Sequence, residues 1–330
     1  MKLHEYKNAF EGAIVAAAQH FGIAEIYVEK DYWVTLALKQ IFADENSRDI
    51  AVFKGGTSLS KCFKIIERFS EDIYMVVIKE DGETDNSLKR KLKKVTRSLE
   101  AVMTIIPDHP LENKRGKIRK VVYGYEKVGV KGVFGQVRDH IVLEVSSLGN
   151  SHPSETVNIH SMIGEFIGTT NNPDLIKEYQ LEPFKVKVIS VERTFCEKII
   201  SLIRFSYTEN PLEDFINKVR HTYDLHQLLQ ADRIATFLKS ADFETMLTQV
   251  GMDDDKAIPN DKEWLFKHPS ESLFFCETEK VWETISKTYT GPFRDLLTGK
   301  LPDEKKVLES LMMIGSRLKE IQWNFKETKY

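Results

Sequence analysis

The chain has 330 residues, a formal net charge of −3 at pH 7 and a sequence pI of about 6.3. Its hydrophobic share of 42% and charged share of 29% are typical of a globular protein, with enough chain for one large domain or two ordinary ones. The near balance of acids and bases excludes a globally basic nucleic-acid-binding protein but permits a local basic surface.

The cysteines and the distribution of apolar residues indicate the cellular compartment of the protein. Cys62, Cys196 and Cys276 are odd in number and widely spaced, so they predict neither a disulfide framework nor a zinc site. The first residues are polar and mixed in charge, unlike a signal peptide, and no apolar run approaches the ~20 residues of a membrane span. We therefore expect a cytoplasmic protein with no membrane segment.

The first half of the chain predicts alternating helices and strands. Helices are expected over residues 3–20, 29–39 and 87–104. Strands are expected over residues 50–54, 73–78, 117–128 and 140–146. After the first strand, Thr57 or Ser58 suits a helix N-cap, with the helix continuing to Glu67.

The second half is predicted to be mostly helical. The expected helices cover residues 191–204, 216–230, 233–250, 270–289 and 304–325. Residues 151–182, with their Pro and Asn-Asn-Pro turns, are interpreted as a connection. The fold class is therefore α/β (α+β): a mixed-sheet domain over residues 1–185, followed by a helical-bundle domain over residues 186–330.

A glycine turn ends the first predicted strand. Gly55 and Gly56 allow backbone dihedrals closed to other residues and close approach of a phosphate. Thr57 and Ser58 add hydroxyl donors, and the start of the following helix favours an anion. Ordinary turn chemistry explains such a junction as well.

Asp72 opens the second apolar strand, where a carboxylate is costly unless it is paired or binds a metal. Because side chains alternate along a strand, residue 74 faces the same way as Asp72. That position holds Tyr74, whereas two-metal chemistry would place a second carboxylate there. Glu144, in another apolar strand, could supply an acid, or it could be paired with a Lys or Arg.

The helices of the second half carry further polar groups. Lys198 could reach a phosphate or could be an ordinary solvated lysine. Arg220, Tyr223 and Asp224 fall on one side of their helix, either as part of a site or as a packing network.

Positive side chains concentrate in the helix predicted over residues 87–104. This concentration favours binding of a polyanion, with RNA phosphates the obvious candidate, although a merely solvated helix is the alternative. The helix cations are Lys89, Arg90, Lys91, Lys93, Lys94 and Arg97, and Lys114, Arg115, Lys117, Arg119 and Lys120 follow.

Four segments together resemble the AbiEii/AbiGii family of nucleotidyltransferase toxins, which act in bacterial phage defence and toxin–antitoxin systems. They are residues 29–33 (EKDYW), 53–61 (FKGGTSLSK) leading into 69–73 (FSEDI), 193–198 (RTFCEK) and 220–225 (RHTYDL). The combination, in the family's order over roughly residues 29–225, is what makes the resemblance specific.

The resemblance implies a polymerase-beta-like nucleotidyltransferase core that uses Mg²⁺. It implies that Gly55, Gly56, Thr57 and Ser58 cradle a nucleoside triphosphate. It implies that Asp72 and Glu144 are metal ligands, with Lys198 contacting phosphate or base and Asp224 completing the site. Its implied partners are nucleoside triphosphates, an RNA acceptor (tRNA 3′ ends in some members) and an antitoxin protein.

Tyr74 departs from the family pattern, which is Ser-Glu-Asp-Ile-Asp where this chain has Ser-Glu-Asp-Ile-Tyr. Losing a metal-bridging carboxylate should remove several kcal/mol of transition-state stabilisation. The leading hypothesis is a magnesium-dependent nucleotidyltransferase toxin acting on RNA. The alternatives are a catalytically silent member that binds nucleotide, RNA or a partner, and a kinase-like phosphotransferase.

Overall fold

The structure is a computed structural model that describes residues 1–128, 137–257 and 263–325. The chain divides into two compact units. The sheet unit comprises Met1–Cys62, Phe69–Ser147 and Ser154–Ile189. The helical unit comprises Phe63–Arg68, Leu148–Pro153 and Ser190–Tyr330. Two short segments of the first half thus belong to the helical unit.

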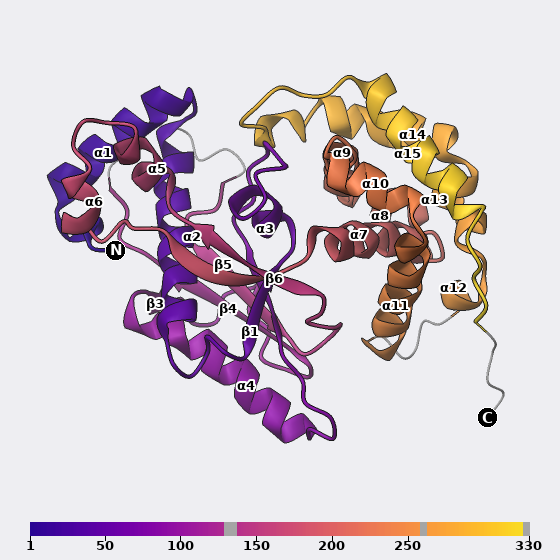
Figure 1. Ribbon diagram of the computed structural model, residues 1–330, viewed down its shortest axis with the longest axis horizontal. Helices are drawn as coiled ribbons and strands as arrows, with labels where there is room; N and C mark the ends of the chain where they lie inside the picture. Colours follow the sequence, from indigo (N-terminus) through magenta and orange to yellow (C-terminus); the bar gives the residue numbers. More distant parts are fainter. Residues whose placement is uncertain (129–136, 258–262, 326–330) are drawn as a thin grey trace. The chain divides into compact units, whose positions relative to one another are not determined.

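The sheet unit is built on a mixed sheet whose seven described strands run in the order β3-β4-β5-β2-β1-β7-β6 (Figure 1). Strands β2 and β5 are parallel, as are β1 and β7, and the other neighbours are antiparallel. The strands are β1 (Ala51–Lys54), β2 (Ile73–Val77), β3 (Thr104–Ile105), β4 (Ile118–Gly124), β5 (Ile141–Ser146), β6 (Ser154–Ile159) and β7 (Phe184–Ile189).

Helix α4 (Asp85–Arg97) covers one face of this sheet, against β2, β4 and β5 (Figure 1). The buried Leu92 and Val95 form its inner side. Two residues of β4 donate hydrogen bonds to Thr96 of this helix. The Tyr123 hydroxyl donates to the Thr96 carbonyl, and Arg119 Nε donates to Thr96 Oγ1 at 2.9 Å. Arg119 and Tyr123 therefore mark the α4 face of β4.

The opposite face carries a polar row across four strands. Register pairs Lys54 of β1 with Tyr74 of β2, Tyr74 with Glu144 of β5, and Glu144 with Lys120 of β4. All four are half-buried, whereas the adjacent residues Phe53, Met75, Leu143 and Val121 are buried in the core. Side-chain alternation thus places this row across the sheet from α4.

The sheet unit has further helices, of which α2 (Glu25–Ala43) contacts α1, η2, α5 and strand β7. The others are η1 (Leu3–Glu5), α1 (Lys7–Phe21), α3 (Gly56–Lys61), η2 (Ser98–Ala101), α5 (Met162–Gly168) and α6 (Asp174–Glu178).

Two acids of α2 bind segments far away in sequence. Glu29 accepts a hydrogen bond from the backbone N–H of Val128 at 2.9 Å. Asp31 accepts from Lys61 Nζ at 2.6 Å and from the N–H of Met162 at 2.7 Å. Because Lys61 is the last residue of α3, Asp31 fixes the helix that follows the glycine turn.

In the helical unit, α7 packs against α9 and α11, and α15 packs against α9 and α14. The helices are α7 (Val191–Phe205), α8 (Pro211–Asn217), α9 (Val219–Leu229), α10 (Asp232–Lys239), α11 (Ala241–Ala257), α12 (Glu263–Phe266), η3 (Pro269–Glu271), α13 (Leu273–Cys276), α14 (Thr278–Thr290), η4 (Arg294–Leu296) and α15 (Glu304–Leu318). None of the helices in the described ranges has the length and apolar character required to cross a bilayer.

The predicted class, a mixed sheet followed by helices, is confirmed, but several elements differ. The connection expected over residues 151–182 is wrong: it contains β6, α5 and α6. The helix after β1 ends at Lys61 rather than Glu67, and Gly55, not Thr57 or Ser58, is its N-cap. The helix expected over 233–250 breaks at Ser240, whose backbone is extended, so α10 and α11 are separate.

Candidate active site

The turn between β1 and α3 requires glycine at residue 55. Gly55 has a φ of 82°, a conformation that residues with a side chain rarely adopt. A Cβ atom there would also lie 3.2 Å from Cδ2 of the Tyr74 ring. Gly56 follows as the first residue of α3. The two glycines therefore bring the backbone of the turn directly against β2.

The two hydroxyl residues of the turn are buried and bonded within the protein. Ser58 Oγ donates to the carbonyl of Gly55 at 2.7 Å. Thr57 Oγ1 donates to the carbonyl of Asp72 at 2.5 Å and shares a 2.9 Å hydrogen bond with Ser70 Oγ. These hydroxyls hold the turn in shape and attach it to Asp72, so both are engaged within the protein.

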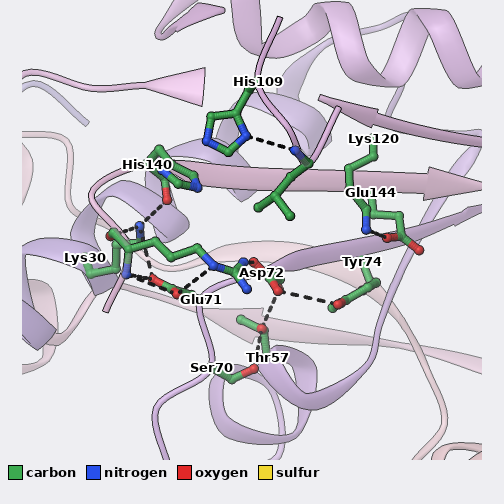
Figure 2. Close-up of polar contacts among 12 residues, drawn as sticks. Lys30, Thr57, Ser70, Glu71, Asp72, Tyr74, His109, Lys120, His140 and Glu144 are labelled. Carbon is green, nitrogen blue, oxygen red and sulfur yellow. Dashed lines mark hydrogen bonds and ion pairs between the residues drawn. The ribbon is translucent and has the colours of Figure 1, made fainter. Parts of the chain in front are cut away.

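Each oxygen of the Asp72 carboxylate faces a proton donor (Figure 2). Arg138 Nη1 lies 2.6 Å from Oδ1, and the Tyr74 hydroxyl lies 3.5 Å from Oδ2. Burial raises the pKa of Tyr74, and the negative charges of Asp72 and Glu144 raise it further. Tyr74 therefore stays protonated near neutral pH and can donate to the carboxylate.

The backbone of Arg138 is anchored on both sides by an ion pair. Its N–H donates to the carboxylate of Glu71, 3.0 Å from Oε2, and its carbonyl accepts from Lys30 Nζ at 2.7 Å. Lys30 and Glu71 are themselves 3.3 Å apart, and Lys30 also donates to the carbonyl of His140 (Figure 2). Lys30 is fully buried, so this ion pair forms a closed polar network beneath the segment that carries Arg138.

Glu144 is paired with a cation. Its Oε2 lies 2.7 Å from Lys120 Nζ, and both side chains are partly exposed (Figure 2). Glu144 is also the cross-strand neighbour of Tyr74. Glu144 therefore lies on the sheet face that carries Tyr74. It forms an ion pair with a lysine, which was the alternative to a free acid in the sequence analysis.

In the helical unit, Asp224 is fully buried and bound by two cations. Arg68 holds it bidentately, with Nε–Oδ1 and Nη2–Oδ2 distances of 2.7 Å. Lys198 Nζ lies 2.7 Å from Oδ2. Burial alone would raise the pKa of Asp224, but the neighbouring guanidinium and ammonium groups hold it well below its usual value. Lys198 and Asp224 are thus partners of each other within this unit.

His221 lies one turn before Asp224 on α9. Among the described residues, its Nδ1 finds no hydrogen-bond partner. Burial, reinforced by the charges of Lys198 and Lys218, lowers the pKa of His221 well below its usual value. His221 is therefore neutral at pH 7, and the charge of this cluster comes from its other members.

The cations of α4 divide into two kinds. Lys91 is partly buried and binds Glu83 at 2.8 Å, Glu80 at 3.3 Å and the carbonyl of Ile78 at 2.9 Å. The other five are exposed on the outer side of the helix: Lys89, Arg90, Lys93, Lys94 and Arg97. They lie on the layer opposite the Tyr74 row.

Sequence reasoning missed Arg138 and Lys30, which bind Asp72 and Glu71, and named Lys120 only among the cations of the basic region rather than as the partner of Glu144. Only Lys30 left a signal, because it stands in the family segment over residues 29–33 and a buried lysine needs a partner. Arg138 stands in a stretch without periodicity.

No group of three or more His, Cys, Asp or Glu side chains in the described part of the chain is placed to hold a metal ion. Mg²⁺, however, is commonly bound by one or two carboxylates together with substrate phosphates. Asp72, beside the glycine turn, provides one such carboxylate, while Tyr74 cannot provide the second. The donor set therefore fits one nucleotide-bound Mg²⁺ at Asp72 rather than a dedicated protein site for two ions.

Comparisons with known proteins show the family of the chain. A structural comparison finds MenT4, a nucleotidyltransferase toxin from Mycobacterium tuberculosis H37Rv, at 13% sequence identity and a TM-score of 0.48, covering 94% of this chain and 90% of MenT4. A search of curated proteins finds no match. The family model described as "Nucleotidyl transferase AbiEii toxin, Type IV TA system" matches residues 36–309. This match confirms the resemblance seen in the sequence, and the chain belongs to the AbiEii family of nucleotidyltransferase toxins of type IV toxin–antitoxin systems.

Proposed function

We propose that the sheet unit binds a nucleoside triphosphate with Mg²⁺ at Asp72 and the turn over residues 55–58, and transfers its nucleotidyl group to RNA. The supporting observation is the attachment of the turn to Asp72 through Thr57, which keeps a carboxylate beside the half-buried backbone of Gly55 and Gly56. A phosphate on the turn would then lie next to the group that can hold its metal.

The proposed reaction forms a bond between an acceptor hydroxyl oxygen and the α-phosphorus and releases pyrophosphate. Bound Mg²⁺ would supply neutralising charge and polarise the phosphorus. Asp72 would hold the metal–triphosphate, and the tight Gly55 turn would orient the phosphates. The protonated Tyr74 would keep one Asp72 oxygen hydrogen-bonded and so limit its rotation.

RNA is the acceptor we propose, with tRNA as the candidate, because α4 presents five exposed cations. Since these lie across the sheet from the Tyr74 row, they would contact the body of the RNA rather than its reacting end. Lys91 contributes less to this surface than its position in the sequence predicts, because Glu80 and Glu83 already neutralise it.

The remaining proposals follow from family membership. An antitoxin protein is the expected partner, and phage defence in the bacterial cytoplasm is the expected setting. Asp224 and Lys198 stay proposed catalytic residues through their place in the family segments. In the helical unit the two residues form an ion pair with each other.

A catalytically silent, nucleotide- or RNA-binding protein is the second candidate. The observation that favours it is that Asp72 already has donors on both oxygens, Arg138 and Tyr74, with no second carboxylate at residue 74. Under this candidate the site binds nucleotide without turnover.

The test is transfer of α-³²P-labelled nucleotide to total bacterial RNA with Mg²⁺, each of the four nucleotides separately, beside Asp72→Asn. Label in RNA that disappears in Asp72→Asn, by a factor of roughly 10² or more, supports the nucleotidyltransferase. Nucleotide binding by calorimetry without any transferred label supports the silent candidate. Label that moves only from the γ position would indicate a phosphotransferase instead.

A further inference from the structure

We propose that Arg138 is a nucleotide-binding residue: its guanidinium contacts the triphosphate and supplies positive charge where a second metal ion would act in a two-carboxylate site. This inference rests on the proposed function and specifies how that site works with Tyr74 in it. Nothing in the family segments points to Arg138, which lies between them.

The first support is the geometry of the Arg138–Asp72 pair. Its contact is monodentate, through Nη1 at 2.6 Å, and the side chain of Arg138 is 38% exposed. The Arg68–Asp224 pair in the helical unit is the contrast, because it is bidentate and its side chains are 4% and 0% exposed. A guanidinium has five N–H donors, and Arg138 uses one of them in a hydrogen bond to the described residues, while its Nε lies 3.9 Å from Glu71 Oε1 as a longer ion pair.

The second support is the anchoring of the residue. The Lys30–Glu71 pair binds the N–H and carbonyl of Arg138, so its main chain is fixed while its side chain remains accessible. A purely structural ion pair with Asp72 would not need the backbone of its arginine to be held separately. A positioned cation does need this, because a phosphate contact gains from a donor whose location is set in advance.

The third support is the charge at residue 74. An aspartate there would add a second negative charge next to Asp72 and call for a second cation. Residue 74 is a tyrosine, not a carboxylate, and its hydroxyl lies 3.5 Å from Asp72 Oδ2, so Asp72 is the acid of this pair. Arg138 provides one permanent positive charge at that point, and arginine binds phosphate oxygens in a planar, forked geometry. Arginines placed this way stabilise phosphoryl groups in other transfer enzymes.

The experiment compares wild type, Arg138→Gln and Arg138→Lys by calorimetric titration with ATP, GTP, CTP and UTP in excess Mg²⁺. The corresponding monophosphates are titrated beside them. We expect Arg138→Gln to weaken triphosphate binding roughly 10- to 100-fold, the effect of one missing charge-assisted hydrogen bond. Monophosphate binding should change much less. Arg138→Lys should fall between, because it keeps the charge but loses the fork.

The control is Arg48→Gln, which removes an exposed arginine paired with Asp49 in the same unit. It should bind as wild type does. Equal triphosphate affinity in wild type and Arg138→Gln would overturn the inference, as would equal losses for triphosphate and monophosphate, which indicate a disturbed fold. If wild type binds none of the four triphosphates, the proposed function itself fails, and the inference falls with it.

Discussion

The ring of Tyr74 packs on the backbone of Gly55, so that a Cβ atom at Gly55 would lie 3.2 Å from Cδ2 of the ring. The glycine turn and the residue that replaces the expected second carboxylate are therefore in direct contact. Tyr74 thus does more than replace the expected carboxylate. Its ring packs against the proposed phosphate-binding turn and limits the conformation of that turn.

Gly55→Ala should destabilise the protein by about 1–3 kcal/mol, because φ at this residue is positive and the added methyl group meets the Tyr74 ring. Urea denaturation measures the loss. Gly12→Ala is the matched control: nothing lies within 4 Å of its Cβ position in helix α1, so it should be neutral or stabilising by up to about 1 kcal/mol. Equal stability of the two variants would show that the turn tolerates a side chain.

Tyr74→Asp should strengthen divalent-cation binding at the site, because it places a second carboxylate on the face that carries Asp72. Electron paramagnetic resonance with Mn²⁺ measures the affinity in the presence of nucleotide. Tyr74→Phe is the control, since it removes only the hydroxyl and keeps the ring against Gly55. Identical Mn²⁺ affinities in Tyr74→Asp and wild type would mean that residue 74 does not face the metal.

Glu144→Gln and Lys120→Met separate the two roles of Glu144. If Glu144 is a metal ligand, Glu144→Gln lowers RNA labelling, while Lys120→Met preserves or raises it by freeing the carboxylate. Both side chains are partly exposed, so each variant should cost at most about 1 kcal/mol of stability. Similar RNA labelling in both variants and wild type would mean that Glu144 is not a metal ligand and only forms the ion pair with Lys120.

Asp224→Asn should destabilise the protein at pH 7 by about 3–5 kcal/mol, because it leaves Arg68 and Lys198 buried without their counter-ion. The pKa of Asp224 is depressed in the folded protein, so the stabilisation is complete above the unfolded value of ~3.9. It is lost as pH falls below that value. The difference between wild type and Asp224→Asn in chemical denaturation should therefore shrink below about pH 4, and a difference that persists unchanged there would contradict the assignment.

Charge reversal at Lys89, Lys93 and Lys94 should weaken RNA binding and flatten its salt dependence, with the slope falling by about one for each phosphate that is no longer neutralised. Filter binding at several salt concentrations measures both. Lys91→Glu is the contrasting variant, since it breaks pairs with Glu80 and Glu83 and should act mainly on stability. RNA affinity unchanged by the triple reversal would remove α4 from the acceptor surface.

The features that could be predicted from sequence are those set by neighbouring residues. The turn at Gly55, the strand after Asp72 and the family segments are all local, and the structure has β1, α3 and β2 there. Strand β6 was missed because it lies at the edge of the sheet and alternates weakly between polar and apolar residues.

The pairings of the site could not be predicted, because each joins residues far apart in the chain. Arg138 stands 66 residues from Asp72, and only the folded sheet brings them together. A single sequence shows that a carboxylate in an apolar strand needs a partner, but not which cation provides it. For Glu144 that cation proved to be Lys120, on the neighbouring strand.

Two adjacent residues of α2 hold the two sides of the proposed nucleotide site. Asp31 binds Lys61 at the end of α3, the helix that follows the glycine turn, and Lys30 binds the main chain of Arg138. The distance between the turn and Arg138 is thus set by two consecutive residues of one helix, whose backbone spacing is fixed. The site can therefore widen without loss of these contacts only if α2 moves, and a ligand that draws Arg138 inward would pull on the glycine turn through the same helix.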